Sequence, residues 1–406
     1  MKNLGIKISL YLNYFVFAIL LNSVGIVILK AQKNFGVDEV QASILEAFKD
    51  MPIAIVSFFI ASFLPRIGYK KAMLAGLALV SLACIAMYFG NSFDTAKILF
   101  ATVGVSFALI KVSVYSMIGN VTENQKEHNA LMSSIEGVFM IGIALAYFLF
   151  PAFNRDSDPN SWLNVYWLLA ALSGLSFVFL LFTKFEKHVE IPGADVVDDF
   201  LQMFKLLARL LIVIFVISAF LFVMIEQGIM SWLPTFNTKV LHLPENISIM
   251  MASILAISLA AGRILAGVVT KKINWIWVLT FCIVSAMLIV VFILPKTVGL
   301  EVREIHSLSD IPLIGFAFPL VGLFIAPIYP LLNSVVLSAL PKKLHSSMTG
   351  LIVVFSALGG TLGSRTIGWL FKNQGPENAF YFTLIPMSLL LISFFILKKL
   401  TATNEI

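Results

Sequence analysis

Three ionisable residues lie inside one long apolar run, which extends from Val40 to Leu64 and is long enough to cross a bilayer as a helix. They are Glu46, Lys49 and Asp50. At membrane depth such groups cost about 2.5–3.5 kcal/mol each on insertion scales. A helix turns about 100° per residue, so the three share one face, with Glu46 and Asp50 at i,i+4. That face must look into a polar or water-filled interior.

Other apolar runs also contain ionisable residues, namely Lys111, Glu136, Glu226, Arg263 and Arg365. With the first three they make four acidic and four basic groups, a balance that predicts internal pairing. Burial raises the pKa of a carboxylate, and a nearby cation lowers it. A carboxylate under both influences can take up and release a proton in each transport cycle. We therefore predict proton coupling at Glu46, Asp50, Glu136 and Glu226.

Lys111 places an ammonium group near the middle of its run and needs a carboxylate partner. Asp50, Glu46 and Glu136 are the candidates. A role in binding or coupling and a static pair that holds helices together both stay open.

The candidates for binding a polar solute combine amide, aromatic and cationic side chains. Gln227 and Trp232, about one turn apart, are a common way of holding a sugar, and Asn333 is a similar candidate. Lys49, Lys111 and Arg365 favour an anionic solute. Packing or interhelical hydrogen bonding is the alternative for Gln227 and Trp232, and for Arg263 we favour a structural role.

The elements that must position these residues are membrane helices, because 59% of the 406 residues are hydrophobic, 12% are charged and the mean hydropathy is +0.96. Twelve runs are long enough to span a bilayer. They are residues 8–29, 41–64, 73–91, 97–118, 130–152, 163–183, 208–235, 248–269, 275–294, 312–337, 347–371 and 379–397.

Several classes of function are disfavoured by what the sequence lacks. The first run is too long for a removable signal peptide, and the two cysteines fall inside apolar runs. The five histidines lie between runs without metal-ligand spacing, and there is no glycine-rich phosphate-binding loop. We expect no cofactor, no metal, no enzymatic activity and no nucleic-acid partner.

Charge predicts the topology. With both termini cytoplasmic, twice as many Lys and Arg residues face the cytoplasm as face the outside. The longest polar connection divides the chain into an N-terminal six-helix half (residues 1–183), a linker (184–207) and a C-terminal six-helix half (208–406). Within the linker, residues 195–207 show the periodicity of an amphipathic helix on the membrane surface, with a plain linker as the alternative.

The two halves echo one another: the second and the eighth run both end in small apolar residues and a short basic turn, at Arg66–Lys71 and Lys271–Lys272. Parallel repeats of this kind place a binding site between the halves, near the midplane. The turn Leu64-Pro65-Arg66-Ile67-Gly68-Tyr69-Lys70-Lys71 resembles the signature of the major facilitator superfamily, with Pro65 in place of its usual aspartate. Residues 227–234, Gly262-Arg263 and Ile328-Tyr329-Pro330 resemble the fucose permease branch.

The resemblance implies an all-α membrane protein of twelve transmembrane helices in two six-helix halves, with a central cavity. The third, sixth, ninth and twelfth runs contain no charge, as the lipid-facing helices of that superfamily would require. The coupling carboxylates of the branch match Asn22 and Lys111 here, so the acidic chemistry has moved, and Glu136 stands where the branch has a neutral polar residue. Asn22 and Tyr329 join the binding candidates on this basis.

We therefore expect a monomeric secondary active transporter of a bacterial inner membrane, working by alternating access. Its expected activity is proton-coupled import of a small hydrophilic metabolite, either sugar-like or carboxylate-bearing, such as an organic acid or a siderophore. The alternatives are an efflux antiporter and a non-transporting receptor built on a transporter fold. The fifth run lacks the Gly-Pro pair associated with drug exporters of this superfamily, which favours import.

Overall fold

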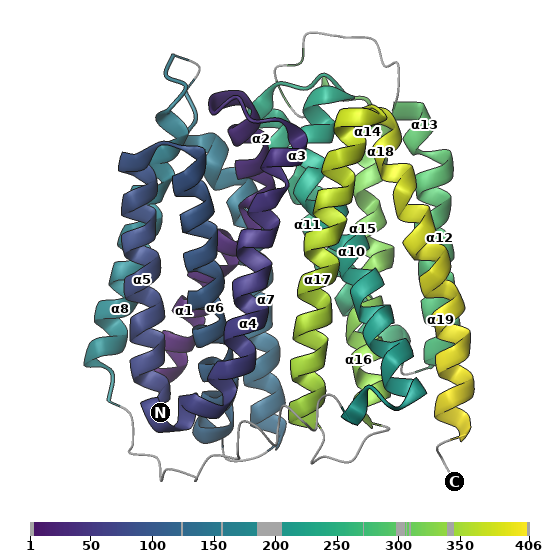
Figure 1. The fold of residues 1–406 in the computed structure, drawn as a ribbon, viewed down its shortest axis with the longest axis horizontal. Helices are drawn as coiled ribbons and strands as arrows, with labels where there is room; N and C mark the ends of the chain where they lie inside the picture. Colours follow the sequence, from purple (N-terminus) through teal and green to yellow (C-terminus); the bar gives the residue numbers. More distant parts are fainter. Residues whose placement is uncertain are drawn as a thin grey trace. The chain divides into compact units, whose positions relative to one another are not determined.

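The computed structural model describes residues 4–122, 125–155, 157–184, 205–270, 272–297, 305, 307, 310–338 and 345–403. In these ranges the chain is helical and forms no named strand. Eleven helical segments are long and apolar enough to cross a membrane, and the 24-residue helix α4 (Ile44–Ile67) is the twelfth. Each coincides with one of the twelve predicted runs, so the predicted membrane fold is confirmed. Figure 1 shows these long helices.

The chain forms two compact units, whose bounds differ from the predicted halves. Unit 1 comprises Met1–Val27 and Phe48–Asp199, and unit 2 comprises Ile28–Ala47 and Phe200–Ile406. The segment 28–47, which comes from the first two membrane helices, therefore belongs to the unit that contains the C-terminal helices. The predicted boundaries at 183 and 208 stay a prediction. Most of the predicted amphipathic linker helix lies outside the described residues, because these omit 185–204.

Unit 1 contains the first six membrane helices apart from the segment 28–47. Its helices are α1 (Leu4–Asn22), the start of α2 (Val24–Asn34), most of α4, α5 (Tyr69–Gly90), α6 (Phe93–Val121), α7 (Gln125–Phe153), η1 (Ser161–Asn164) and α8 (Val165–Phe182). Ser92 begins α6 with a capping box, since its side chain accepts from the Thr95 amide and Thr95 accepts from the Ser92 amide.

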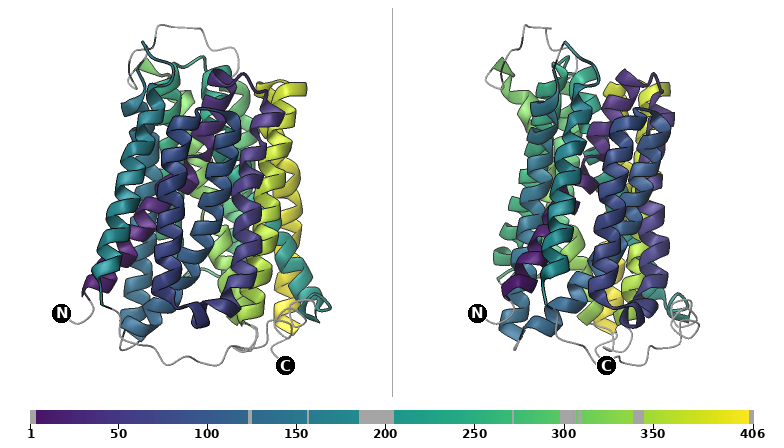
Figure 2. Two further views of the ribbon diagram at one scale, coloured as in Figure 1. Left: turned by 60° about the vertical axis from the view of Figure 1, so that its left-hand side comes forward. Right: turned by 90° about the vertical axis from the view of Figure 1, so that its left-hand side faces the viewer.

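Unit 2 contains the last six membrane helices, with the segment 28–47, which carries the end of α2, α3 (Glu39–Ala42) and the start of α4. The others are α10 (Leu210–Lys239), α11 (Glu245–Val269), α12 (Trp275–Phe292), α13 (Leu294–Thr297), α14 (Leu313–Ala317), η3 (Phe318–Leu320), α15 (Val321–Ile325), α16 (Ile328–Ser338), α17 (His345–Asn373), α18 (Pro376–Ala379), η5 (Phe380–Thr383) and α19 (Leu384–Thr403). Within this unit α10 packs against α17 and α19. Figure 2 shows the helices from two further sides.

The tenth membrane helix is broken into α14, η3, α15 and α16. The first break carries Pro319, and the second falls at Ala326–Pro327, where the chain makes a turn before α16. Proline has no backbone N–H to donate and its ring displaces the preceding turn, so these breaks follow directly from the sequence. They leave Tyr329 in the first turn of the last segment, α16.

Gly104 sets the distance between α4 and α6 inside unit 1. A Cβ atom at this position would collide with the carbonyl oxygen of Lys49 and would approach Pro52 Cβ to 3.2 Å. Only glycine therefore permits this approach, which brings the backbone of the charged stretch in α4 against α6.

Candidate functional site

One face of α6 presents an ammonium group between two aromatic rings. Phe107, Lys111 and Tyr115 follow one another at i, i+4 and i+8, so they lie along the same side of the helix. The Lys111 Nζ atom lies 5.7 Å from the centroid of the Phe107 ring and 5.9 Å from that of Tyr115. Both distances are within the range of cation–π attraction, so the two rings stabilise the positive charge of Lys111.

The neighbouring helices α1 and α7 complete this cluster. The Tyr115 hydroxyl donates to Glu136 Oε1 at 2.7 Å, and Glu136 is the acidic group whose charge acts on Lys111. The Tyr14 ring of α1 lies 5.5 Å from Phe139, and 6.2 Å from both Phe107 and Tyr115, measured between ring centroids. We call the set Tyr14, Phe107, Lys111, Tyr115, Glu136 and Phe139 the Lys111 cluster.

Burial divides the cluster into a floor and a mouth. Tyr14 and Phe107 are buried, whereas Lys111, Tyr115 and Glu136 are half-buried. Two rings of the cluster are thus buried, and a cation, a hydroxyl and a carboxylate beside them are partly exposed. Aromatic faces beside a few convergent polar groups are the usual composition of a small-molecule site. Of the predicted site residues, the structure brings Lys111 and Glu136 together in this cluster.

Asp50, the other main candidate to partner Lys111, is placed elsewhere. Its carboxylate lies 3.5 Å from the ammonium of its neighbour Lys49. Leu109 and Val112, which flank Lys111, pack in one cluster with Leu64 of α4. Gly104, against which the Lys49 carbonyl lies, is seven residues before Lys111, which corresponds to about 10 Å along α6. The structure therefore does not show an Asp50–Lys111 pair.

A second polar cluster lies in unit 2. Arg263 Nη2 of α11 lies 3.3 Å from Glu226 Oε1 of α10, and both groups act electrostatically on Tyr329 of α16. The Tyr329 ring stacks on Phe222 at 5.4 Å between centroids, and its hydroxyl lies 3.4 Å from Ser356 Oγ. The predicted site residues Glu226, Tyr329 and Arg263 thus share one place. Asn333, one turn further along α16, also acts on the Tyr329 hydroxyl.

The remaining binding candidates are dispersed. Trp232 is fully buried, its indole N–H donates to the backbone carbonyl and the hydroxyl of Ser364, and its ring packs on Phe371, so this structure uses it internally. Asn22 donates to the carbonyl of Ala18 at 2.8 Å. Gln227 is half-buried on α10, and Arg365 is exposed on α17.

The segment 28–47 is held within unit 2 by ion pairs that sequence reasoning missed. Glu245, in the first turn of α11, contacts Lys30 and accepts from Lys33 at 2.6 Å. Lys372 donates to Asp38 at 2.8 Å, and Lys239 pairs with Glu39. The hydrogen bond from Lys372, followed by one from the Gln41 amide, lowers the pKa of Asp38 below its ordinary value.

Glu46 belongs to the same arrangement. It is fully buried and accepts a hydrogen bond of 2.8 Å from the Ser231 hydroxyl of α10. The sequence contained one indication that Lys30 is paired, because Lys30 directly follows an apolar run and lies within the helix α2. Glu245 carried another, because it follows Pro244 in the first turn of a helix, where the helix dipole favours an anion.

Known proteins resemble this chain in both sequence and fold. A model of the Major Facilitator Superfamily matches residues 10–364. The glucose/mannose transporter GlcP of Bacillus subtilis is 25% identical over 263 residues, which are 61% of this chain and 59% of that protein, so the matched part spans less than two thirds of this relative.

Among solved structures, a bacterial homologue of the human lysosomal transporter Spinster, in an inward-facing and occupied conformation, superimposes with a TM-score of 0.76 at 12% identity, over 99% of this chain and 97% of that one. A variant of the Escherichia coli fucose:proton symporter FucP superimposes with a TM-score of 0.64 at 13% identity, over 98% of this chain and 99% of that one. At these identities the structural similarity concerns the fold.

Proposed function

The chain belongs to the major facilitator superfamily of membrane transporters, and we propose that it imports a small hydrophilic metabolite together with protons, by alternating access. The observation that carries the proposal is the Lys111 cluster, in which a cation and a carboxylate act on each other among aromatic rings. We place the protein, as a monomer without enzymatic activity, in the inner membrane of a bacterium. The relative GlcP is bacterial, which supports this placement.

A monosaccharide is the substrate class that the cluster fits best. Its apolar C–H face can lie on the Phe139 ring, which is partly exposed, while its hydroxyl groups donate to Glu136 and to the Tyr115 oxygen and accept from Lys111. The names of two similar proteins, a glucose/mannose transporter and a fucose:proton symporter, support the same class.

Glu136 is our proposed proton carrier. As a carboxylate it accepts from Tyr115 and faces the positive charge of Lys111. A proton that binds Glu136 removes this compensating charge, and the solute then supplies the hydrogen-bond acceptors that Lys111 needs. Among the described residues Glu136 has no cation within ion-pair distance, whereas Asp50 pairs with Lys49, Glu226 pairs with Arg263 and the fully buried Glu46 accepts from Ser231. We therefore assign these three to fixed interactions rather than to proton transfer.

A carboxylate-bearing solute is the second candidate. Among the residues that the structure describes, Lys111 has no carboxylate within ion-pair distance. An organic acid would place its carboxylate on Lys111, at the position that a sugar hydroxyl would take.

A thermal-shift screen of the purified protein decides between these classes. Glucose, mannose and fucose form one set, and citrate, malate and a carboxylate siderophore form the other. We expect stabilisation by a sugar, lost in Lys111→Met. Uptake of the stabilising solute into proteoliposomes then tests transport. Solute binding without any counterflow would refute the transporter assignment and favour a receptor, and accumulation driven by outward rather than inward proton flow would indicate an efflux antiporter.

A further inference from the structure

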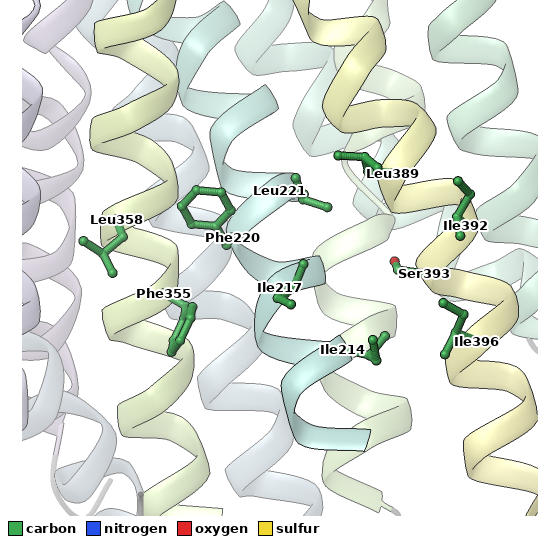
Figure 3. A pocket seen from close by; sticks show the side chains of 10 residues that line it. All are labelled: Ile214, Ile217, Phe220, Leu221, Phe355, Leu358, Leu389, Ile392, Ser393 and Ile396. Carbon is green, nitrogen blue, oxygen red and sulfur yellow. The ribbon is translucent and has the colours of Figure 1, made fainter. Parts of the chain in front are cut away.

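Buried polar groups without a partner distinguish the Lys111 cluster from an apolar groove of unit 2. This groove, of about 430 Å³, lies between α10, α17 and α19, and Figure 3 shows its ten lining side chains. Ser393 is the one polar residue among them, and its hydroxyl already accepts from Ser218 at 2.8 Å and donates to the carbonyl of Leu390 at 2.7 Å. The groove therefore offers no polar group to a proton or to a hydrophilic solute.

The hydroxyl of Tyr14 is such a polar group in the Lys111 cluster. Tyr14 is 1% exposed, so a solute does not reach it, and its hydroxyl makes no hydrogen bond within the part of the chain that the structure describes. A buried hydroxyl that lacks a partner destabilises the folded protein. Phenylalanine would give the same ring contacts with Phe107 and Phe139 without this cost, so ring packing alone does not account for a tyrosine here.

Tyr115 and Glu136 are the two groups that act electrostatically on the Tyr14 hydroxyl. The rings of Tyr14 and Tyr115 lie 6.2 Å apart between centroids, with an angle of 35° between their planes. Tyr115 donates a hydrogen bond to Glu136 Oε1 at 2.7 Å, and a phenol oxygen that donates can also accept. A small shift of the Tyr14 side chain therefore lets its hydroxyl donate to the Tyr115 oxygen, which in turn donates to Glu136.

Three ionisable side chains face Glu136 from the neighbouring helices. They are Lys111 and Tyr115 of α6 and Tyr14 of α1. On α7 itself, the preceding ionisable residue is His128, about two turns away. Tyr14 is thus the group of α1 that can influence the proton of Glu136.

Tyr11, one turn before Tyr14 on α1, is engaged elsewhere. Its hydroxyl lies 2.5 Å from Ser134 Oγ of α7. Because the Ser134 hydroxyl donates to the carbonyl of Leu131 at 2.9 Å, Tyr11 is the donor of this bond. Tyr11 therefore provides a matched control, a tyrosine of the same helix whose hydroxyl has its own partner.

We propose that Tyr14 is a positioning residue for Glu136, because its hydroxyl donates to Tyr115 and thereby strengthens the hydrogen bond from Tyr115 to the Glu136 carboxylate. This inference rests on the proposed role of Glu136 as the proton carrier. Hydrogen bonds in a chain polarise one another, and a bond to an ionised acceptor is about twice as strong as a neutral one. The chain that begins at Tyr14 therefore favours the carboxylate over the carboxylic acid. It sets the pH at which Glu136 takes up its proton, without any contact between Tyr14 and the solute.

Infrared difference spectroscopy of the purified full chain, titrated with acid, tests the proposal. The C=O stretching band of a protonated carboxyl reports proton uptake, and the band that disappears in Glu136→Gln belongs to Glu136. Tyr115→Phe removes a hydrogen bond to the carboxylate, so the midpoint pH of this band should rise by about one to two units. Tyr14→Phe should raise it by about 0.3–0.6 unit, because one bond in a chain strengthens the next by up to about 30%. Added to Tyr115→Phe, Tyr14→Phe should cause no further change.

Tyr11→Phe is the control, and its midpoint should equal that of the parent. Thermal unfolding confirms that each phenylalanine variant is folded. An unchanged midpoint in Tyr14→Phe, or the same further rise when it is added to Tyr115→Phe, would overturn the proposal. The titration does not depend on transport. Uptake by the parent that ignores an inward proton gradient would refute the proposed function, and the titration would still decide the role of Tyr14.

Discussion

Lys111 in unit 1 and Lys30 in unit 2 are both lysines in apolar helices, and they are stabilised in opposite ways. Lys30 is 2% exposed and pairs directly with Glu245, whose side chain is 9% exposed and also binds Lys33. Lys111 is half-buried between aromatic rings, and the carboxylate that faces it is bonded to Tyr115. The ion pair of Lys30 with Glu245 holds a segment in place. The ammonium of Lys111, which is stabilised by aromatic rings, can still bind a solute.

Loss of Lys30 should give the largest effect, on stability. Lys30→Met leaves Glu245 buried with one cation fewer, and breaking a buried pair costs about 3–5 kcal/mol. Lys33→Met should cost less than about 1 kcal/mol, because Lys33 is 64% exposed. Thermal unfolding in detergent measures both. If the two variants unfolded at the same temperature, the distinction between a buried and an exposed pair would be lost.

Loss of Lys111 should affect transport and spare the fold. A hydrogen bond to a charged group contributes about 1.5–3 kcal/mol, so Lys111→Met should reduce uptake by about 10- to 100-fold. Because Lys111 and Glu136 are both half-buried, and Glu136 can take up a proton when the cation is lost, the unfolding temperature should stay near that of the parent. Uptake and unfolding of the same preparation are the measurement. A strongly destabilised Lys111→Met with normal specific uptake would make Lys111 a structural residue like Lys30.

Gly368 tests how closely the segment 28–47 packs in unit 2. A Cβ atom there would approach the Trp232 ring to 2.5 Å and the Glu39 carbonyl oxygen to 2.9 Å. Gly368→Ala should therefore destabilise the protein by about 1–3 kcal/mol. Gly137→Ala is the control, since nothing lies within 4 Å of its added Cβ. Equal unfolding temperatures for the two alanine variants would argue against the close packing.

The smallest effect concerns pH. Because the pKa of Asp38 is lowered in the folded state, the stabilisation by Lys372 is present above the ordinary aspartate pKa and is lost as the pH falls through the lowered value. The parent should therefore unfold at a slightly higher temperature than Lys372→Gln at pH 6, and the gap should close below about pH 4. Lys296→Gln, at another exposed lysine, should show no such pH-dependent gap. A gap that persisted at low pH would exclude the Asp38 carboxylate as its source.

The sequence predicted the twelve membrane helices because bilayer thickness fixes the length of an apolar run. It also identified Lys111 and Glu136, since a charge inside such a run is costly and therefore noticeable. It could not choose among Asp50, Glu46 and Glu136 as the partner of Lys111, because the axial offset between α4 and α6 depends on contacts such as the one at Gly104.

The ion pairs of the segment 28–47 escaped prediction for a related reason. Lys30 and Glu245 are far apart in sequence. Each lies next to the end of an apolar run, where charged residues are common and do not by themselves indicate a pair. Trp232 was predicted to bind a solute on its residue type, and only the structure shows that Ser364 takes its indole N–H. Long-range pairing of side chains is therefore what the sequence alone left undetermined.

Glu136→Gln separates solute exchange from proton coupling, through two transport modes of one proteoliposome preparation. Counterflow exchanges labelled for unlabelled solute without net proton movement, and accumulation requires an inward proton gradient. We predict that Glu136→Gln keeps counterflow within about threefold of the parent, because glutamine still accepts from Tyr115. It should lose gradient-driven accumulation entirely. Accumulation equal to that of the parent, with the same dependence on the pH gradient, would contradict the assignment of Glu136 as the proton carrier.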